Sequence, residues 1–273
     1  MKRIIAWLAA AVLLLSGAGA ENISDRIIIL DDFPAPAAPA EEREPWKPVH
    51  LAEADRATIG SDERVIIARP EEYPYSAIAY LDVTGSCVHG GWYASGFMIE
   101  KDLMMTAGHC LYCPLCHAPA QEIDFYFGYR NARNYTVCNR GDSWQAYVPR
   151  QVAEGKDYQR YDYAVIRLDE NVGVKTGYFA IRHDVPDDEL SGASFHVTGY
   201  RNGVLRQDMD RVEPVDERYL IHYADTEQQN SGCPVYDQDN RVIAIHTAEG
   251  KEGTRNYAVR ITGDIYAEIE RHR

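Results

Sequence analysis

The chain has 273 residues, a formal net charge of −14 and six cysteines, with 45% hydrophobic and 26% charged residues. This is the composition of an ordinary globular protein, and it excludes wholesale disorder, a collagen-like repeat and a polytopic membrane protein. The excess of carboxylates also argues against a nucleic-acid-binding protein, because phosphate backbones are bound by clustered Lys and Arg.

The first twenty residues have the pattern of a secretory signal peptide. Lys2 and Arg3 precede an apolar run from Ile4 to Leu15, and small residues follow up to Ala20. A membrane anchor is the alternative, but the run is shorter than the roughly 20 residues that a membrane-spanning helix needs. We therefore expect cleavage after Ala20, and a secreted or periplasmic protein without membrane contact after that cleavage.

Residues 21–57 form a second segment that looks separate from the rest. It is rich in carboxylates and contains a Pro/Ala run from Pro34 to Pro48. Such a stretch cannot bury enough apolar surface to offset its ordering entropy, although Ile27 to Leu30 can dock on another surface. The segment is either a flexible linker or a propeptide.

From Tyr75 onward, short apolar runs rich in β-branched and aromatic residues are separated by Gly, Asn and Asp. This pattern predicts an all-β protein of sandwich or barrel type. The spacing of Ile265 and Ile269 predicts one short amphipathic helix near the end, over about 263–272. The expected strands are 77–83, 93–99, 103–106, 123–129, 163–168, 195–198, 219–223, 242–246 and 257–261.

Three segments contain residues that can support acyl transfer. His109 lies in TAGHC after an apolar strand, Asp162 opens the strand in YDYAVIRL, and Ser231 lies in a tight Asn-Ser-Gly turn. A serine nucleophile needs a base, a carboxylate that orients the imidazole, and backbone N–H donors for the oxyanion. Each residue alone has a structural explanation as a turn or surface residue. Their order and strand contexts together predict a catalytic triad.

The chain resembles the chymotrypsin-fold serine peptidases, and among them the secreted bacterial glutamyl endopeptidases. The resemblance covers residues 59–269 and implies two antiparallel β-barrels of the chymotrypsin type, with the catalytic cleft between them. It is carried by IGSDER (59–64), ASGFMI (94–99), TAGHC (106–110), DYAVIRL (162–168), VTGY (197–200), VIAIHT (242–247) and NYAVRI (256–261).

The same resemblance implies how the chain is divided. Residues 21–57 would be a propeptide removed near Arg56 to Ile59, and residues 58–273 would be the peptidase domain. The N-terminal barrel is expected over about 58–155 and the C-terminal barrel over about 156–260. The protein is expected to be a monomer that hydrolyses protein or peptide substrates without a cofactor, and to have no nucleic-acid partner.

The resemblance also implies an acidic substrate. His246 in AIHT matches the family histidine that contacts the acidic side chain, and Thr226 matches a hydroxyl residue of the same pocket. An imidazole and a hydroxyl can both donate a hydrogen bond to a carboxylate. We therefore expect cleavage after Glu or Asp.

One position departs from the family. The family has Gly two residues before the nucleophile, where its N–H and that of Ser231 form the oxyanion hole, but this chain has Gln229. Gln keeps the N–H, yet its Cβ disfavours a positive φ. A catalytically weak or inactive homologue that acts as a binding module is therefore the alternative. An α/β-hydrolase is disfavoured because Gln229 and Cys233 occupy both glycine positions of its Gly-x-Ser-x-Gly elbow.

The cysteines allow two interpretations. Cys110, Cys113, Cys116 and His117 resemble a zinc knot, but cysteines of exported proteins commonly form disulfides. We therefore expect disulfides and no metal site. The resemblance points to Cys87 with Cys110 as one pair, while six cysteines allow fifteen pairings and the sequence selects none of them.

Overall fold

The computed structural model describes residues 26–30, 56–57, 59, 61–155, 158–250 and 253–273. The predicted signal peptide and most of the predicted propeptide therefore lie outside the described residues. Within the ranges that are described, no helix is both long and apolar enough to cross a membrane.

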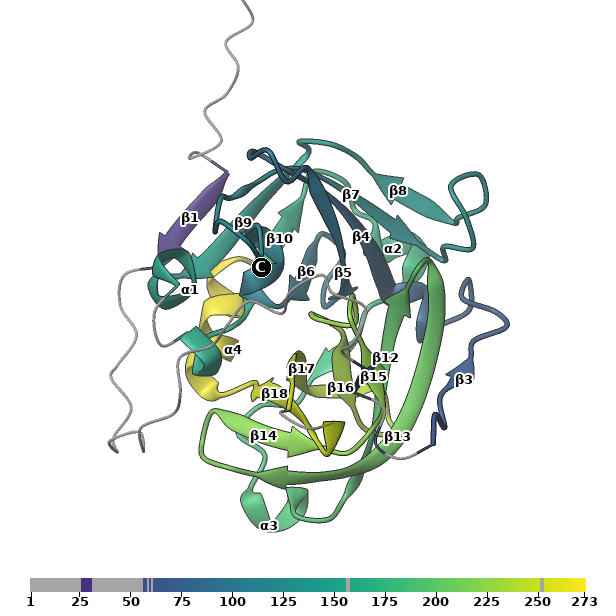
Figure 1. Cartoon of the computed structure of the whole chain (residues 1–273), viewed down its shortest axis with the longest axis vertical. Helices are drawn as coiled ribbons and strands as arrows, with labels where there is room; N and C mark the ends of the chain where they lie inside the picture. Colours follow the sequence, from purple (N-terminus) through teal and green to yellow (C-terminus); the bar gives the residue numbers. More distant parts are fainter. Residues whose placement is uncertain (1–25, 31–55, 58, 60, 156–157, 251–252) are drawn as a thin grey trace, which may run out of the picture.

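The first half of the domain forms one curved sheet, in the upper part of Figure 1. In order of hydrogen bonding, its strands are β1 (Ile27–Leu30), β9 (Trp144–Pro149), β10 (Ala164–Leu168), β6 (Leu103–Thr106), β5 (Gly91–Met98), β4 (Ile78–Gly85), β7 (Ala120–Phe127) and β8 (Val137–Asn139). The central β6 is apolar and buried throughout, whereas β7 mixes buried and exposed positions along its length. One face of this sheet therefore packs on the core while part of the other meets water.

The second half forms a sheet that closes on itself, in the lower part of Figure 1. Its ring consists of β17 (Arg241–Glu249), β16 (Pro234–Tyr236), β12 (Ser194–Arg201), β13 (Val204–Pro214), β14 (Tyr219–His222) and β18 (Asn256–Arg260), and β18 pairs again with β17. The short β11 (Ala180–Ile181) pairs in parallel with β17, and β3 (Val65–Ile66) pairs with β13. Closure removes the free edges that an open sheet would expose.

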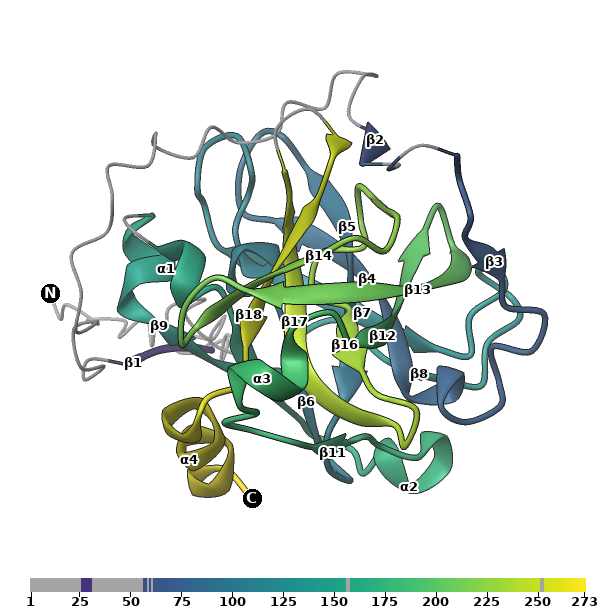
Figure 2. The same ribbon diagram turned by 90° about the horizontal axis from the view of Figure 1, so that it is seen from below.

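The C-terminal helix α4 (Gly263–Arg271) leaves the second barrel and packs on the first (Figure 2). Ile265 and Ile269 are fully buried, and burial of such a side chain contributes about 1.5–3 kcal/mol. The ring of His272 stacks on Tyr147 of β9 with centroids 3.5 Å apart, and Arg167 of β10 donates to the His272 carbonyl. The helix therefore joins the two barrels at their far end from the cleft loops.

The remaining helical segments are short. They are α1 (Arg150–Glu154), α2 (Gly173–Thr176) and α3 (Asp187–Leu190), with the single 3-10 turns η2 (Tyr75–Ala77), η3 (Gly108–Leu111) and η4 (Tyr158–Arg160). The prediction of an all-β protein with two barrels and a short C-terminal helix is confirmed, and every strand expected from the sequence is present.

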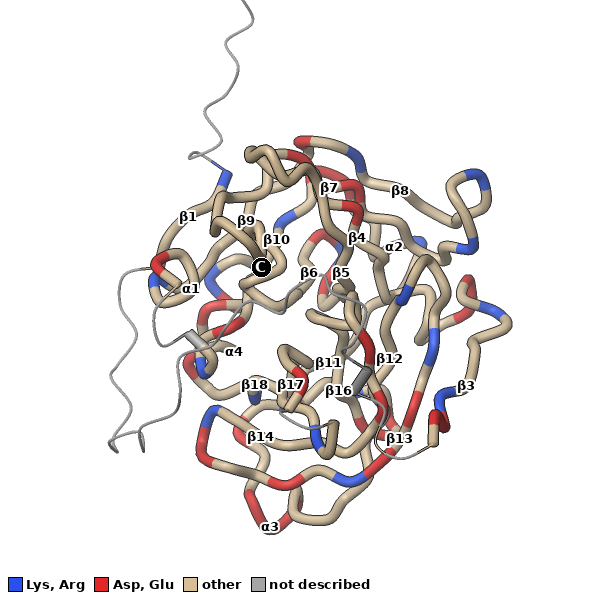
Figure 3. The backbone as a smooth tube through the Cα atoms, viewed as in Figure 1, with Lys and Arg blue, Asp and Glu red and all other residues tan. Residues whose placement is uncertain are grey.

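The structure corrects the expected boundary between the barrels. Strand β10 pairs with β6 and β9 of the first sheet, so the chain passes to the second barrel only after Leu168, later than the predicted boundary near residue 155. The apolar strand completes the core of the first barrel. The sequence analysis also missed β13, which carries both basic and acidic residues along one side of the molecule (Figure 3).

Candidate active site

The three residues of the predicted triad border one cleft between the barrels. His109 lies in η3 just after β6, and Asp162 lies just before β10. Ser231 comes from the second barrel, in the turn between β15 (Thr226–Glu227) and β16. All three line a cleft with a volume of about 340 Å³. The fold thus brings together residues that lie far apart in the sequence.

Asp162 holds His109 in a fixed orientation. Its Oδ1 accepts a hydrogen bond from the backbone N–H of His109 at 2.8 Å, and its Oδ2 lies 2.6 Å from Nδ1 of the imidazole. Burial by itself lowers the pKa of His109, but the Asp162 carboxylate and the Cys110 sulfur outweigh it and raise that pKa well above 6.5. The carboxylate keeps a proton on Nδ1, so Nε2 is left to accept one from a nucleophile.

The Ser231 hydroxyl has no hydrogen bond to another described residue. Instead, the sulfur of Cys110 lies 3.8 Å from Nε2 of His109 and 3.5 Å from the carbonyl oxygen of Ser231. Hydrogen bonds between nucleophile and base are often long in substrate-free enzymes and shorten in the complex. The structure therefore fixes the base and the carboxylate more tightly than it fixes the nucleophile.

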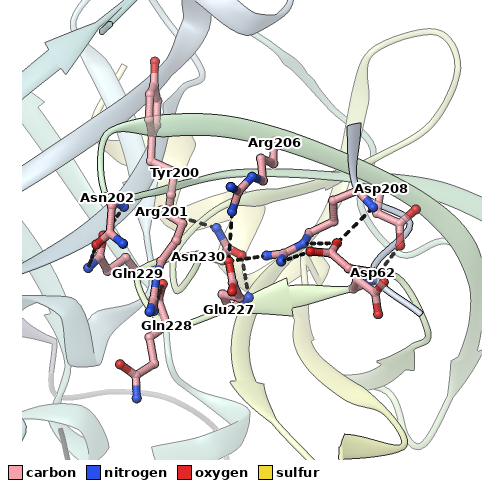
Figure 4. Close-up of polar contacts among 12 residues, drawn as sticks. Asp62, Tyr200, Arg201, Asn202, Arg206, Asp208, Glu227, Gln228, Gln229 and Asn230 are labelled. Carbon is pink, nitrogen blue, oxygen red and sulfur yellow. Dashed lines mark hydrogen bonds and ion pairs between the residues drawn. The ribbon is translucent and has the colours of Figure 1, made fainter. Parts of the chain in front are cut away.

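Gln229 adopts the backbone conformation for which glycine is suited, with φ of 78°. A left-handed residue with a Cβ costs roughly 1–2 kcal/mol. Figure 4 shows how the side chain offsets this cost: its Oε1 accepts the Asn202 N–H at 2.7 Å, and its Nε2 donates to Asn202 Oδ1 at 3.1 Å. Gln229 therefore holds the left-handed conformation at the position where the resemblance implies glycine.

The turn presents two backbone donors. Among the described residues, the N–H groups of Gln229 and Ser231 have no acceptor, whereas Asn230 between them donates to the Glu227 carbonyl at 3.0 Å. Gly232, with φ of 87°, lies so close to the first barrel that a Cβ would stand 2.2 Å from the Ser95 carbonyl oxygen. Free N–H groups held rigidly beside a nucleophile are suited to an oxyanion.

Sequence reasoning missed Ser95, which connects the first barrel to this turn. Its hydroxyl donates to the Gln229 carbonyl at 2.8 Å and accepts the Tyr200 N–H at 2.9 Å. Its own N–H donates to the Ser231 carbonyl at 2.9 Å. The only signal in the sequence was a lone hydroxyl in the buried strand ASGFMI.

Comparison with known proteins identifies the family. The sequence profile of the trypsin-like peptidase domain matches residues 94–245, which is more than half of the chain. The chain belongs to the trypsin-like peptidase family.

Known bacterial proteases resemble the peptidase over most of its length. It is 29% identical over 220 residues to the extracellular metalloprotease of Bacillus subtilis, covering 78% of this chain and 68% of that protein. It is 28% identical over 242 residues to the glutamyl endopeptidase of Bacillus licheniformis, covering 83% of this chain and 72% of that protein.

Solved structures share its fold. A Glu endopeptidase in complex with MPD matches with a TM-score of 0.67 at 26% identity, over 79% of this chain and 98% of the other. The protease Anisep from Arthrobacter nicotinovorans matches with a TM-score of 0.56 at 17% identity, over 72% and 95% of the two chains, which shows the fold alone. The peptidase is a serine endopeptidase of the chymotrypsin fold, as the sequence predicted.

The peptidase has a buried pair of histidines at one end of the cleft. His246 of β17 borders the cleft, and its Nδ1 lies 2.9 Å from Nε2 of His222 on β14. Burial lowers the pKa of His222 to about 3 and, together with the neighbouring imidazoles, lowers that of His246 well below 6.5. Both rings are therefore neutral in the free enzyme. Sequence reasoning missed His222, because a histidine on an apolar strand gives no functional signal by itself.

Thr226 of the peptidase is placed differently from His246. It is buried on β15 and does not border the cleft. Its Oγ1 has no hydrogen-bond partner among the described residues, and neither has Nδ1 of His222. Unpaired buried polar groups cost about 1–3 kcal/mol each, so these two atoms mark where a polar partner would be stabilising.

Residues around the predicted processing region lie against the same part of the molecule. β2 (Arg56–Ala57) pairs with β15, with Ala57 opposite Thr226. The N–H of Ile59 donates to Oδ1 of the buried Asp225 at 2.6 Å. In the uncut chain, the predicted processing region therefore contacts the strand that carries Thr226.

The cysteines differ from the expectation. All six are free thiols in the structure, so the expected disulfides are absent. The implied pair of Cys87 with Cys110 is not formed, and the two side chains face different neighbours. The Cys110 sulfur faces His109 and Ser231, whereas Cys87 lies beside His89, Cys113 and Cys116.

Proposed function

We propose that the peptidase hydrolyses peptide bonds with Ser231 as nucleophile, His109 as general base and Asp162 as the carboxylate that orients it. The observation that carries this proposal is that these three residues border one cleft, with the His109 imidazole 2.6 Å from Asp162 and two free backbone N–H groups beside Ser231. Substrates are proteins or peptides, as for the known peptidases that the chain resembles.

The chemistry follows from these positions. Oγ of Ser231 attacks the carbonyl carbon while Nε2 of His109 takes the hydroxyl proton, and Asp162 stabilises the resulting imidazolium. The negative oxygen of the tetrahedral intermediate accepts hydrogen bonds from the N–H groups of Gln229 and Ser231. His109 then returns the proton to the leaving amine. Water hydrolyses the acyl-enzyme by the same route in reverse, which regenerates the free hydroxyl.

The preferred substrate has an acidic residue before the cleaved bond. The neutral His246 borders the cleft, and a carboxylate that reaches it can accept a hydrogen bond and draw a proton onto the His246 and His222 pair. The unpaired hydroxyl of Thr226 does not border the cleft while β2 pairs with β15, and it becomes a second donor for that carboxylate once β2 is removed. The names of the two relatives with 28% and 26% identity, a glutamyl endopeptidase and a Glu endopeptidase, support this preference. They favour Glu over Asp as the preferred residue.

The chain is made as an exported precursor in this proposal. Residues 1–20 direct export and residues 21–57 are removed near Arg56 to Ile59. The pairing of β2 with β15 supports the second step, because cleavage there would free the strand that carries Thr226. The extracellular location in the name of the Bacillus subtilis relative supports the first.

The proposal is tested by incubating the purified processed protein with an unfolded protein and reading the new termini by mass spectrometry. We expect Glu, and less often Asp, before each cut, and no cuts with the Ser231→Ala variant. Termini without acidic residues would contradict the specificity. Equal cutting by the two proteins would contradict catalysis by Ser231. Absence of cutting by both proteins would favour a binding module.

A second comparison isolates the specificity residue. His246→Ala should lose hydrolysis of a Glu-containing peptide far more than hydrolysis of a small neutral ester, because only the peptide presents a carboxylate to the histidine. His183→Ala is the control that removes the same residue type, since His183 is exposed and does not border the cleft. Equal losses on both substrates would assign His246 a structural role.

The processing step has its own readout. N-terminal sequencing of secreted, active protein should start between Ala57 and Gly60. Fully active protein that still begins at Glu21 would contradict the propeptide.

A further inference from the structure

Two loops beside the cleft bring four potential metal ligands together. The sulfurs of Cys87, Cys113 and Cys116 and a ring nitrogen of His89 all lie within 4.8 Å of one another. Nδ1 of His89 is 3.5 Å from the Cys87 sulfur and 3.6 Å from the Cys113 sulfur. In a tetrahedral zinc site, with Zn–S of about 2.3 Å and Zn–N of about 2.05 Å, nitrogen and sulfur are about 3.6 Å apart and two sulfurs about 3.8 Å apart. The two nitrogen–sulfur distances already match such a site, and the three sulfurs lie within 4.8 Å of one another.

The second loop is held in shape by its own backbone. The loop is itself closed by the Cys113 N–H, which donates to the Ala118 carbonyl at 2.7 Å.

The first loop is a tight connection between β4 and β5. The Gly90 N–H donates to the Cys87 carbonyl at 3.1 Å, and Gly90 has φ of 77°. The Ser86 hydroxyl donates to the Pro119 carbonyl at 2.9 Å, which ties this loop to the second one. The ligand positions are therefore held by the fold before any ion binds, so little ordering entropy opposes binding.

We propose that Cys87, His89, Cys113 and Cys116 bind one zinc ion. Three thiolates and one imidazole form a soft, four-ligand donor set that suits tetrahedral zinc. Binding converts three thiols to thiolates and releases their protons to solvent. All four positions are filled by protein atoms, so no position is left for substrate and the ion is structural. This inference does not depend on the proposed function.

The ligand set differs from the zinc knot that the local sequence suggests. His117 stacks on Tyr112 with ring centroids 4.7 Å apart, and its Nε2 lies 2.9 Å from the Ala153 carbonyl oxygen. Cys110 faces the catalytic histidine. In the proposed site, Cys87 and His89 from the preceding loop take the places of Cys110 and His117.

The ion would hold one wall of the cleft. Cys113 lies four residues after His109, and Tyr112 and Pro114 on either side of it border the cleft. An ion that connects Cys113 to the loop between β4 and β5 fixes this wall where a disulfide would otherwise be expected. It also withholds three thiols from oxidation in an exported protein.

The site is tested by metal analysis of the full-length secreted chain carrying Ser231→Ala, which prevents self-digestion. We expect about one zinc per chain, and three thiols that react with an alkylating reagent only after a strong chelator is added. The expected metal content falls to little or none in His89→Ala and Cys116→Ser. It stays unchanged in His117→Ala and Cys138→Ser, which remove the same residue types outside the cluster.

Three results would overturn the proposal. They are a parent protein that binds no zinc even when zinc is supplied with a reductant, a disulfide between any two of Cys87, Cys113 and Cys116 in the isolated protein, and zinc that persists in both ligand variants. Circular dichroism establishes that each variant is folded.

A measurement without ligand variants covers the case in which they do not fold. Cobalt(II) is exchanged into the Ser231→Ala chain, and its absorption spectrum is recorded. Intense thiolate-to-cobalt bands with tetrahedral d–d bands support the site. A spectrum of cobalt bound only by oxygen and nitrogen overturns it.

Discussion

Gln229 is held in a conformation that glycine adopts freely, and substitutions there separate backbone strain from side-chain anchoring. The positive φ with a Cβ costs roughly 1–2 kcal/mol. The two hydrogen bonds to Asn202 are partly exposed. At the low end of about 0.5–1.5 kcal/mol each, together they stabilise this conformation by about 1 kcal/mol. Strain and anchoring therefore nearly cancel in the natural chain.

Gln229→Ala keeps the strain and loses the anchor. Loss of about 1 kcal/mol of anchoring shifts the equilibrium between the catalytic turn and a relaxed turn about 5-fold toward the relaxed one, which lowers the population of the catalytic conformation by up to about 5-fold. Because the N–H of residue 229 is proposed to act in the transition state, kcat should fall by that factor with KM little changed. Gln229→Gly loses both strain and anchor, so its kcat should stay close to that of the parent.

The assay is steady-state hydrolysis of a peptide with Glu before a fluorogenic leaving group. Asn202→Ala, made in the parent and in Gln229→Gly, completes a double-mutant cycle. It should lower kcat in the parent but cause no further loss of kcat in Gln229→Gly, because that variant no longer has the side-chain pair. The reasoning is refuted if Gln229→Ala retains the parental kcat, or if Gln229→Gly loses as much as Gln229→Ala.

Two further predictions concern the base and the bridging serine. The raised pKa of His109 places the acid limb of kcat/KM above pH 6.5, because only the neutral imidazole accepts a proton. Asp162→Asn should move that limb to lower pH in a pH–rate profile and reduce kcat by about 10⁴, and an unmoved limb would contradict the assignment. Ser95→Ala leaves the Tyr200 N–H unpaired in a buried site and should lower the free energy of unfolding by about 1–3 kcal/mol in urea titrations, with a lower kcat. No change in either quantity would show that the bridge is dispensable.

Local patterns in the sequence were sufficient for much of the fold. Strands such as 103–106 and 163–168 are apolar runs, and Ile265 with Ile269 shows a helical spacing, so each could be found without knowledge of its neighbours. β13 was missed because its exposed positions carry charges and only pairing with β12 and β14 makes the segment extended. The boundary between the barrels was misplaced because β10 belongs to the first sheet only through its hydrogen-bond partners.

The sequence by itself determined the two-barrel peptidase fold and the candidates His109, Asp162, Ser231 and His246, because these depend on short motifs in a recognisable order. Only the tertiary structure decided what surrounds them. Ser95 supports the turn of the proposed nucleophile across the barrel interface, and the proposed Cys and His ligands come from two loops instead of one. Such contacts join residues that are distant in the chain, and no local periodicity or spacing encodes which loops will meet.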